Sequence, residues 1–386
     1  MNHEAQTKVR RESAPAQSRV RSLLVLGRPG SGKTALLLGT ALYLRERGMD
    51  VRYLKPVGFA FGGEGVDADA LLMGRVLGLP EPPSALAPLV LGVHAFPTDV
   101  EEFARKVEEM LARVEEAGRT AGSAVLLVDG PGRPHRLAAF GGDSLTLGEK
   151  LGAHLAYVVR PKDGDDAVDE AVFYLERGRE RGLPWAGIVF SAVRPHEESR
   201  IEEIYRPILA RRGIPVLGSV PYTPALSAPT ARVFASVLGG KVYETGPLDR
   251  PVEQVLVGAM TPERALSYFR RFSNVAVITG GDRTDLAAAA LEADLSLLIL
   301  SGGIEPDVRV LVRAEERSVP VLLVDEDTYT VARKVEEISR VLSADDGDAV
   351  ETAKSVVAQT LGKNLEALFG FSPGEGAQDA RVSPQE

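Results

Sequence analysis

The 386-residue chain contains no cysteine, which excludes disulfides and thiolate metal sites and fits a reducing compartment. No apolar run approaches the roughly 20 residues that span a bilayer. Residues 1–20 lack the hydrophobic segment of a secretory signal. The net charge of −9 leaves no excess of positive charge for nucleic acid or an anionic membrane surface. We therefore expect a cytoplasmic protein that binds neither nucleic acid nor membranes.

The composition that remains is typical of a globular protein. Hydrophobic residues make up 44% of the chain and charged residues 26%, and the length favours two or three domains. Residues 1–20 are polar and charged, and residues 372–386 are rich in Pro, Gly, Gln and charge. Such segments bury too little apolar surface to fold, so we expect a disordered tail at each of these places.

The first half is organised around residues 22–34, which read SLLVLGRPGSGKT. They match G-x-x-x-x-G-K-[ST] between an apolar strand over 22–27 and a helix over 33–47. In this setting backbone amides turn inward around phosphates, and the helix N-terminus adds partial positive charge. The lysine neutralises β- and γ-phosphates, and the threonine hydroxyl binds Mg²⁺. We expect ATP and Mg²⁺ here, with Lys33 as the catalytic cation, Thr34 as a metal ligand, and nucleotide contacts from Gly27, Arg28, Pro29, Gly30, Ser31, Gly32, Lys33, Thr34 and Ala35.

A second informative stretch is residues 124–132, which read AVLLVDGPG. A fully apolar strand that ends in one acid and a glycine turn is the Walker B pattern, whose acid binds Mg²⁺ directly or through water. The alternative is an ordinary buried strand whose acid caps the next helix. Because the phosphate loop precedes it, we favour Asp129 as a metal-shell residue.

Lys55 ends a strand expected over 49–55, which follows the first helix. A right-handed crossover places this strand parallel to the first, with Lys55 at the sheet edge where ligands bind. Asp67 and Asp69 follow at the start of a helix over 68–77. They either cap that helix or reach the Mg²⁺ shell. We take Asp69 as a metal ligand, and which of the two acids lies nearer the metal stays open.

Further buried strands are expected over 154–160, 185–192 and 214–220, with helices between them. This alternation predicts a doubly wound, mostly parallel sheet with helices on both faces. Loops after its later strands usually hold the base, so Ser191, Pro221 and Tyr222 are candidates for base contacts.

The pattern changes around Gly239, and a second, smaller α/β unit follows, with strands over 254–260, 274–279, 295–301 and 320–324. Two of its strand-to-helix turns, 280–285 and 301–303, form a small anion pocket with Arg283, or simply serve as tight turns. We expect a P-loop domain over 21–238, a second domain over 239–345 and a final helix over 346–371.

The motifs of both halves together are familiar. The loop over 27–34, YLKPVG at 53–58, the acids Asp67 and Asp69, and VDG at 128–130 resemble the dethiobiotin synthetase-like P-loop domains. VGAM at 257–260, ITGGDR at 278–283, LSGG at 300–303 and DTY at 327–329 resemble a DRTGG domain. This pair in this order resembles the N-terminal region of the long form of phosphate acetyltransferase, the phosphotransacetylase family, over about residues 21–342.

The resemblance implies that Lys55 helps to hold phosphate and substrate, as a lysine at this position does in the synthetases. It does not imply acetyl transfer, because the family's acetyltransferase domain needs roughly 300 further residues, more than one domain of usual size. Three positions depart from the families. Asp129 stands where the synthetases usually have Glu, Ser191 where Asn is common, and Ser301 where DRTGG domains have Thr.

Three functions follow as hypotheses. The leading one is a Mg-ATP-binding regulatory or sensor protein without acetyltransferase activity of its own, whose DRTGG domain senses a small-molecule effector or docks a protein. The second is an ATP-dependent carboxylase or amide ligase, for which Lys55 is the main support. The third is a partitioning-type ATPase that dimerises on ATP through Arg28. Hydrolysis, ATP against GTP selectivity, and homo-oligomerisation stay open.

Overall fold

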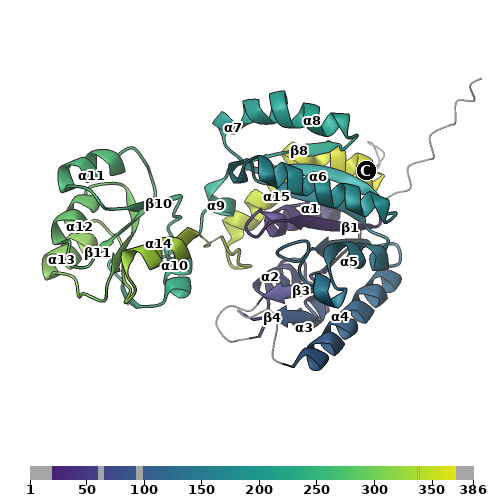
Figure 1. Ribbon diagram of the computed structural model, residues 1–386, viewed down its shortest axis with the longest axis horizontal. Helices are drawn as coiled ribbons and strands as arrows, with labels where there is room; N and C mark the ends of the chain where they lie inside the picture. Colours follow the sequence, from purple (N-terminus) through teal and green to yellow (C-terminus); the bar gives the residue numbers. More distant parts are fainter. Residues whose placement is uncertain (1–19, 60–64, 93–98, 337, 339, 371–386) are drawn as a thin grey trace, which may run out of the picture.

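The computed structural model describes residues 20–59, 65–92, 99–336, 338 and 340–370, arranged as two α/β domains that lie side by side (Figure 1). The tails expected over 1–20 and 372–386 lie outside these residues, except Val20. Val20 is buried, and its amide donates to the Leu368 carbonyl at 3.2 Å. Val20 therefore packs with the folded domain, one residue ahead of the start expected at residue 21.

The first domain is built on a six-stranded sheet in the order β2-β5-β1-β6-β7-β8, in which every neighbouring pair is parallel. This confirms the doubly wound parallel sheet. The crossover from β1 to β2 puts β5 between them, so the ends of β1, β2 and β5 meet at one edge. The strands are β1 (Ser22–Gly27), β2 (Val51–Leu54), β5 (Val125–Asp129), β6 (His154–Val159), β7 (Trp185–Val193) and β8 (Val216–Pro221).

Helices bury both faces of this sheet. One face packs against α1 (Lys33–Glu46), α2 (Ala68–Val76) and α15 (Gly347–Phe369). The other packs against α4 (Val100–Thr120), α5 (Ser144–Leu151), α6 (Asp165–Glu180) and α8 (Arg206–Arg211). A π-helical segment, Ile201–Tyr205, also packs there and joins α8 to the preceding helix α7 (Pro195–Arg200). Smaller elements border the sheet: the parallel pair β3 (Val57–Phe59) and β4 (Leu89–Leu91), helix α3 (Pro83–Leu86), helix α9 (Pro224–Ser227), and 3₁₀ turns at Ala138–Phe140 and Pro161–Asp163.

The helix α15 follows the second domain in the chain but packs on the first (Figure 1). It lies against α1, where the Tyr43 hydroxyl donates to Glu366 at 2.7 Å and Lys354 pairs with Glu46 at 2.7 Å. A Cβ atom built at Gly39 would lie 2.3 Å from the Ala353 carbonyl oxygen, so the two helix backbones approach each other closely there. The second domain is therefore placed, along the chain, between two parts of the P-loop domain.

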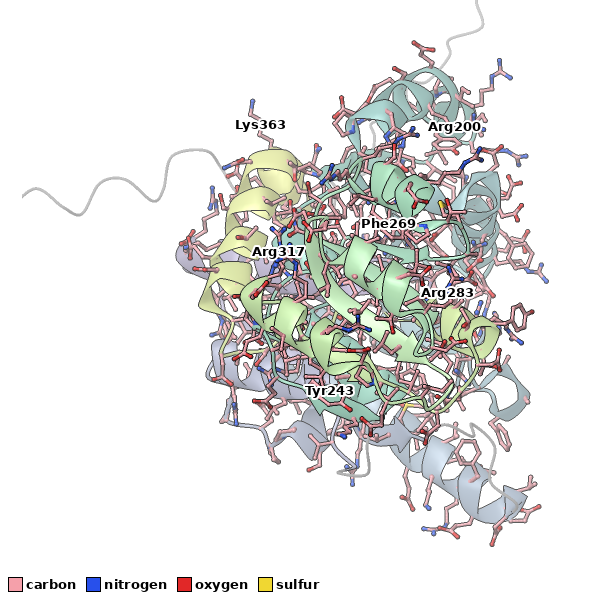
Figure 2. The ribbon with its side chains drawn as sticks, turned by 90° about the vertical axis from the view of Figure 1, so that its left-hand side faces the viewer. Arg200, Tyr243, Phe269, Arg283, Arg317 and Lys363 are labelled. Atoms are coloured by element: carbon pink, nitrogen blue, oxygen red, sulfur yellow. The ribbon has the colours of Figure 1, made fainter. Side chains whose placement is uncertain are left out.

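The second domain contains a five-stranded sheet in the order β10-β11-β12-β13-β9, in which only β9 runs antiparallel to its neighbour. Its strands are β9 (Lys241–Tyr243), β10 (Gln254–Val257), β11 (Val275–Gly280), β12 (Leu295–Ser301) and β13 (Val321–Leu323). Its helices are α10 (Ala231–Leu238), α11 (Pro262–Phe269), α12 (Thr284–Ala290), α13 (Val308–Glu316) and α14 (Thr328–Glu336). Figure 2 views the molecule from this side.

The core of the second domain begins earlier in the chain than expected. Ala231, Phe234 and Leu238 of α10 are buried in one cluster with Ile278 and Val331 of the second domain. Packing thus places α10 in the second domain, and the boundary falls before residue 231 rather than after 238.

Candidate functional site

The phosphate loop connects β1 to α1 in a conformation that depends on glycine. Gly27, Gly30 and Gly32 have φ values of 150°, 69° and 94°, which L side chains rarely adopt. At Gly32 a Cβ atom would also lie 2.6 Å from the Ser191 hydroxyl oxygen. The Ser31 hydroxyl is buried and has no hydrogen-bond partner among the described residues. The loop therefore has the shape and the unused donor of a phosphate cradle.

Lys33 lies within this loop rather than in solvent. Its ammonium donates to the carbonyls of Gly27 and Arg28, each at 3.0 Å. Burial lowers the pKa of Lys33, and the carboxylate of Asp129 partly opposes this. The first turn of α1 contains no acidic residue, so nothing on the helix competes with an anion at its N-terminus.

Thr34 and Asp129 meet at the ends of α1 and β5. The Thr34 hydroxyl donates to Asp129 Oδ2 at 3.2 Å, and the Tyr53 hydroxyl donates to the same oxygen at 3.3 Å. Asp129 Oδ1 is buried without a hydrogen-bond partner in the described part of the chain. Burial raises the pKa of Asp129 to about 6, although Lys55 and Lys33 lower it. One carboxylate oxygen is thus fixed and the other is free to serve a ligand.

Lys55 lies between two carboxylates. Its ammonium is 3.1 Å from Asp67 Oδ2 and contacts Asp69 Oδ2 more closely still. Burial lowers the pKa of Lys55, but the charges of Asp69, Asp129 and Asp67 outweigh it and the net pKa is raised. Lys55 is therefore a cation at the sheet edge, beside the phosphate loop.

The two acids differ in how fully they are used. Asp67 caps α2 by accepting from the Ala70 amide at 2.9 Å, and its other oxygen accepts from the Phe59 amide at 2.8 Å. Both Asp67 oxygens are thus engaged within the protein. Among the described residues, Asp69 has one side-chain contact, from its Oδ2 to Lys55. Of the two acids, Asp69 has the oxygen to spare for a metal shell, and its role as a metal ligand stays a prediction.

Arg28 is paired within its own chain. Its guanidinium donates to Glu170 of α6 at 2.7 Å, and the Tyr157 hydroxyl donates to the same carboxylate at 2.6 Å. The loop is also held from β6, since Arg160 donates to the Gly30 carbonyl at 2.8 Å. These contacts fix the outer side of the loop.

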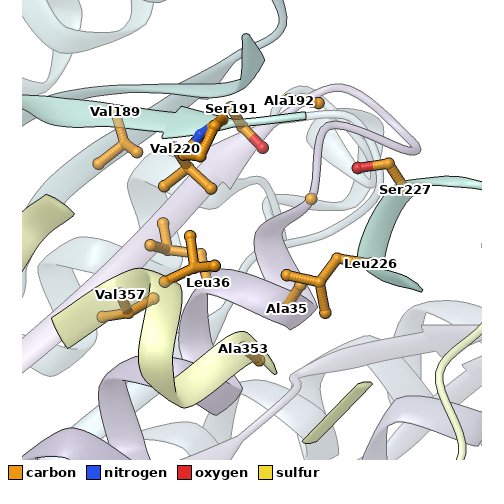
Figure 3. A pocket seen from close by; sticks show the side chains of 13 residues that line it. Ala35, Leu36, Val189, Ser191, Ala192, Val220, Leu226, Ser227, Ala353 and Val357 are labelled. Atoms are coloured by element: carbon orange, nitrogen blue, oxygen red, sulfur yellow. The ribbon is translucent and has the colours of Figure 1, made fainter. Parts of the chain in front are cut away.

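The residues expected to contact a base are only partly brought together. Ser191 and Pro221 line a hollow of about 30 Å³ beside Gly32 and Ala35 (Figure 3). Tyr222 does not line it; its ring lies under the Arg194 guanidinium, 4.5 Å from the ring centre.

In the second domain, Arg283 pairs with Asp285 at 3.2 Å. The Ser301 hydroxyl bonds the Thr328 hydroxyl at 2.7 Å. The side chains of Arg283 and Ser301, which the sequence placed in an anion pocket, are thus bonded to neighbouring residues of the same domain. In Figure 2, Arg283 and Tyr243 lie well apart on this domain.

Two site residues escaped the sequence analysis. Tyr53 lies in β2, two positions before Lys55, which follows the last residue of that strand. Side chains two positions apart along an extended chain share a face, so that signal was present. Arg160 could not be found this way, because its bond to Gly30 joins residues that lie 130 positions apart.

Two further features of the described residues concern membranes and metal ions. None of their helices is long and apolar enough to cross a membrane. Nor do they contain a cluster of three or more His, Cys, Asp or Glu suited to a metal. Mg²⁺ usually takes one or two protein ligands and completes its shell with phosphates and water, so Thr34 and Asp129 suffice for it.

The parallel sheet, the loop and the Thr34–Asp129 pair define a P-loop ATPase-like protein with a second α/β domain. Comparison with known families agrees. The chain belongs to the AAA domain family, which matches residues 21–230, and it carries a DRTGG domain over residues 234–338. The resemblance to these two domains is thereby confirmed.

Individual relatives match one or both domains. A phosphate acetyltransferase of Pseudomonas putida is 27% identical over 92% of this chain and 52% of its own length. The ATP-dependent dethiobiotin synthetase BioD of Anaeromyxobacter dehalogenans is 29% identical over 58% of this chain and 99% of its own. The septum site-determining protein MinD of Pyrococcus horikoshii, complexed with Mg-ADP, is 17% identical with a TM-score of 0.34, over 53% of this chain and 82% of its own. The chain thus spans about half the length of the acetyltransferase it matches.

Proposed function

We propose that this protein binds Mg-ATP in its P-loop domain and acts as a regulatory or sensor protein, with the DRTGG domain receiving an effector or a protein partner. The observation that carries the proposal is Asp129, whose Oδ2 is held by Thr34 and Tyr53 while Oδ1 is buried without a partner among the described residues. A buried polar atom left unpaired costs about 1–3 kcal/mol, which a bound cation or its water offsets. The proposal concerns nucleotide binding alone.

Each residue of the site has a role that follows from its side-chain chemistry. Thr34 and Asp129 would hold Mg²⁺, which neutralises phosphate charge when bound. Lys33 exchanges its carbonyl partners at Gly27 and Arg28 for phosphate oxygens, which are stronger acceptors for an ammonium. Lys55, released from Asp69, supports the terminal phosphate. Any catalysis by this set is positioning and electrostatic stabilisation of an in-line attack.

The test is calorimetric titration of the full chain with ATP and with GTP, each with and without Mg²⁺, while phosphate release is followed in parallel. We expect Mg²⁺-dependent binding of ATP that Lys33→Ala abolishes. The variant's melting temperature is measured alongside, because Lys33 also ties the loop together. Binding with negligible phosphate release supports a sensor, whereas failure of the wild-type protein to bind either nucleotide refutes the proposal.

A second candidate is an ATP-dependent carboxylase or amide ligase. Lys55 at the sheet edge and the similarity to a dethiobiotin synthetase favour it. Such an enzyme passes phosphate to a carboxylate and then forms a C–N bond. Steady phosphate release that rises with an added carboxylate or amine substrate would favour the ligase over the sensor.

The partitioning-type switch has less support. That mechanism needs a cation near the first P-loop glycine that reaches a second subunit. Here Arg28 is bound to Glu170 of its own chain at 2.7 Å, in a partly buried pair. We therefore rank the dimerising ATPase below the other two functions.

A further inference from the structure

We propose that α15 forms the wall against which the base of the bound nucleotide rests, and that Val356 determines how well the base fits. This inference rests on the proposed function, since a base is placed here only when its phosphates occupy the loop over 27–34. It goes beyond that function by assigning base recognition to a helix that follows the DRTGG domain in the chain.

The first step is position. The hollow begins at the phosphate loop, where Gly32 and Ala35 line it, and extends along the start of α1. A nucleotide held by the loop through its phosphates leads its sugar and base away from that point. The ends of β7 and β8 close the hollow on one side through Ser191 and Pro221. The base is thus directed to this side of the loop.

The side of the hollow opposite the sheet is formed by α15. Ala353 and Val357 of α15 line the hollow from below in the view of Figure 3, facing Val189 and Val220 of the sheet. Val356 of the same helix also lines it. A flat aromatic base prefers apolar walls with a few polar groups that orient it. The hydroxyls of Ser191 and Ser227 point into the space between these walls in Figure 3 and provide such groups.

The third step is size. A hollow of about 30 Å³ has room for about two water molecules, which is less than a purine ring needs. Entry of a base therefore requires a side chain at the mouth to move. Val356 and Leu226 are only half-buried and apolar, whereas Ala353 and Val357 are buried. Of the α15 residues, Val356 is the one whose size and rotamer decide whether the base fits.

The helix α15 is held in a fixed position, which a wall that discriminates between bases requires. Asn364 of α15 donates to the Leu217 carbonyl of β8 at 2.6 Å. A Cβ atom at Gly362 would lie 2.7 Å from the Tyr43 hydroxyl oxygen of α1. The helix backbone is thereby fixed against both the sheet and α1, and adjustment is left to side chains.

The experiment titrates the full chain with two probes, Mg-ATP and Mg-tripolyphosphate, which share the phosphates but not the base. Val356→Leu adds one methylene group at the mouth and is expected to weaken Mg-ATP binding about tenfold without changing tripolyphosphate binding. Val356→Ala widens the mouth and is expected to leave Mg-ATP binding equal or up to about threefold tighter. Val350→Leu is the matched control, since Val350 packs from the same helix but does not line the hollow.

The outcomes separate this inference from the proposed function. Unchanged Mg-ATP binding in Val356→Leu overturns the inference, as does equal weakening of both probes, which would place the effect on the loop. Wild-type protein that binds tripolyphosphate as tightly as ATP also overturns it, because the base then makes no net contact. Wild-type protein that binds neither probe refutes the proposed function itself.

Discussion

Replacement of Asp129 by Asn should stabilise the nucleotide-free protein while removing its response to Mg²⁺. Burial, the largest influence, raises the pKa of Asp129 to about 6, against the lowering effects of Lys55 and Lys33. A carboxyl whose pKa is higher in the folded state favours folding when protonated. This stabilisation is complete below the unfolded value of 3.8 and is lost as pH rises through 6. Above pH 6 the ionised carboxylate therefore weakens the fold, and an uncharged amide relieves that cost.

The magnitude follows from the two pKa values. A rise from 3.8 to about 6 corresponds to about 3 kcal/mol at pH 7.5 and about 1 kcal/mol at pH 4.5. In a domain of about 200 residues each kcal/mol moves the melting temperature by about 2–4 °C. The gain at pH 7.5 is thus at most about 6–12 °C, reduced by any misfit of the amide with the hydroxyls of Thr34 and Tyr53.

The assay is thermal melting of wild type and Asp129→Asn, without nucleotide, at pH 7.5 and pH 4.5. The variant should melt higher at pH 7.5, by a margin that shrinks to about a third at pH 4.5. Asp50→Asn, at an exposed position before β2, is the matched control and should show no such margin. A variant that melts below wild type at pH 7.5, or a margin equal at both pH values, would refute the reasoning.

Four further variants test other contacts. Tyr53→Phe removes one donor to Asp129 Oδ2 and should weaken Mg²⁺-dependent ATP binding by about 1 kcal/mol in calorimetry, while metal-free ATP binding stays unchanged; an equal loss without Mg²⁺ contradicts this. Gly39→Ala places a Cβ atom against the Ala353 carbonyl and should cost about 1–3 kcal/mol in urea unfolding, whereas Gly347→Ala, with open space around it, should cost little. Arg28→Ala should leave the sedimentation coefficient with Mg-ATP unchanged, because Arg28 is paired within its own chain; loss of an ATP-dependent dimer would restore the partitioning-type mechanism. Lys55→Met leaves Asp67 and Asp69 without their cation and should cost about 3–5 kcal/mol in urea unfolding, part of which Asp69→Asn should recover; no recovery would show that their charges are not the cause.

The sequence was most informative where local pattern and fold agree. The strand expected over 22–27 is β1, and the loop and helix that follow lie where the motif predicts, because short-range chemistry determines all three. The strand expected over 185–192 is β7, one residue longer. A buried parallel strand is a continuous apolar run, which is visible without knowledge of its neighbours.

The sequence was least informative where a partner lies far away along the chain. The strand β9 has three residues, and its partners in β13 lie about eighty positions later in the chain, so no local period marks it. The helix α15 was expected, but its apolar face does not say which domain it covers. That choice depends on the close approach at Gly39, which appears only once both helices are placed.

The long separation between α1 and α15 has a consequence for synthesis on the ribosome. Tyr43 and Glu366, which are hydrogen-bonded, lie 323 positions apart. Chains fold as they emerge, at about 5–20 residues per second, so the face of α1 that α15 covers stays exposed for tens of seconds. The DRTGG domain, whose strands lie within residues 241–323, is complete before that face is covered. Completion of the P-loop domain therefore comes last, and a polypeptide arrested after residue 340 should expose this apolar face to chaperones.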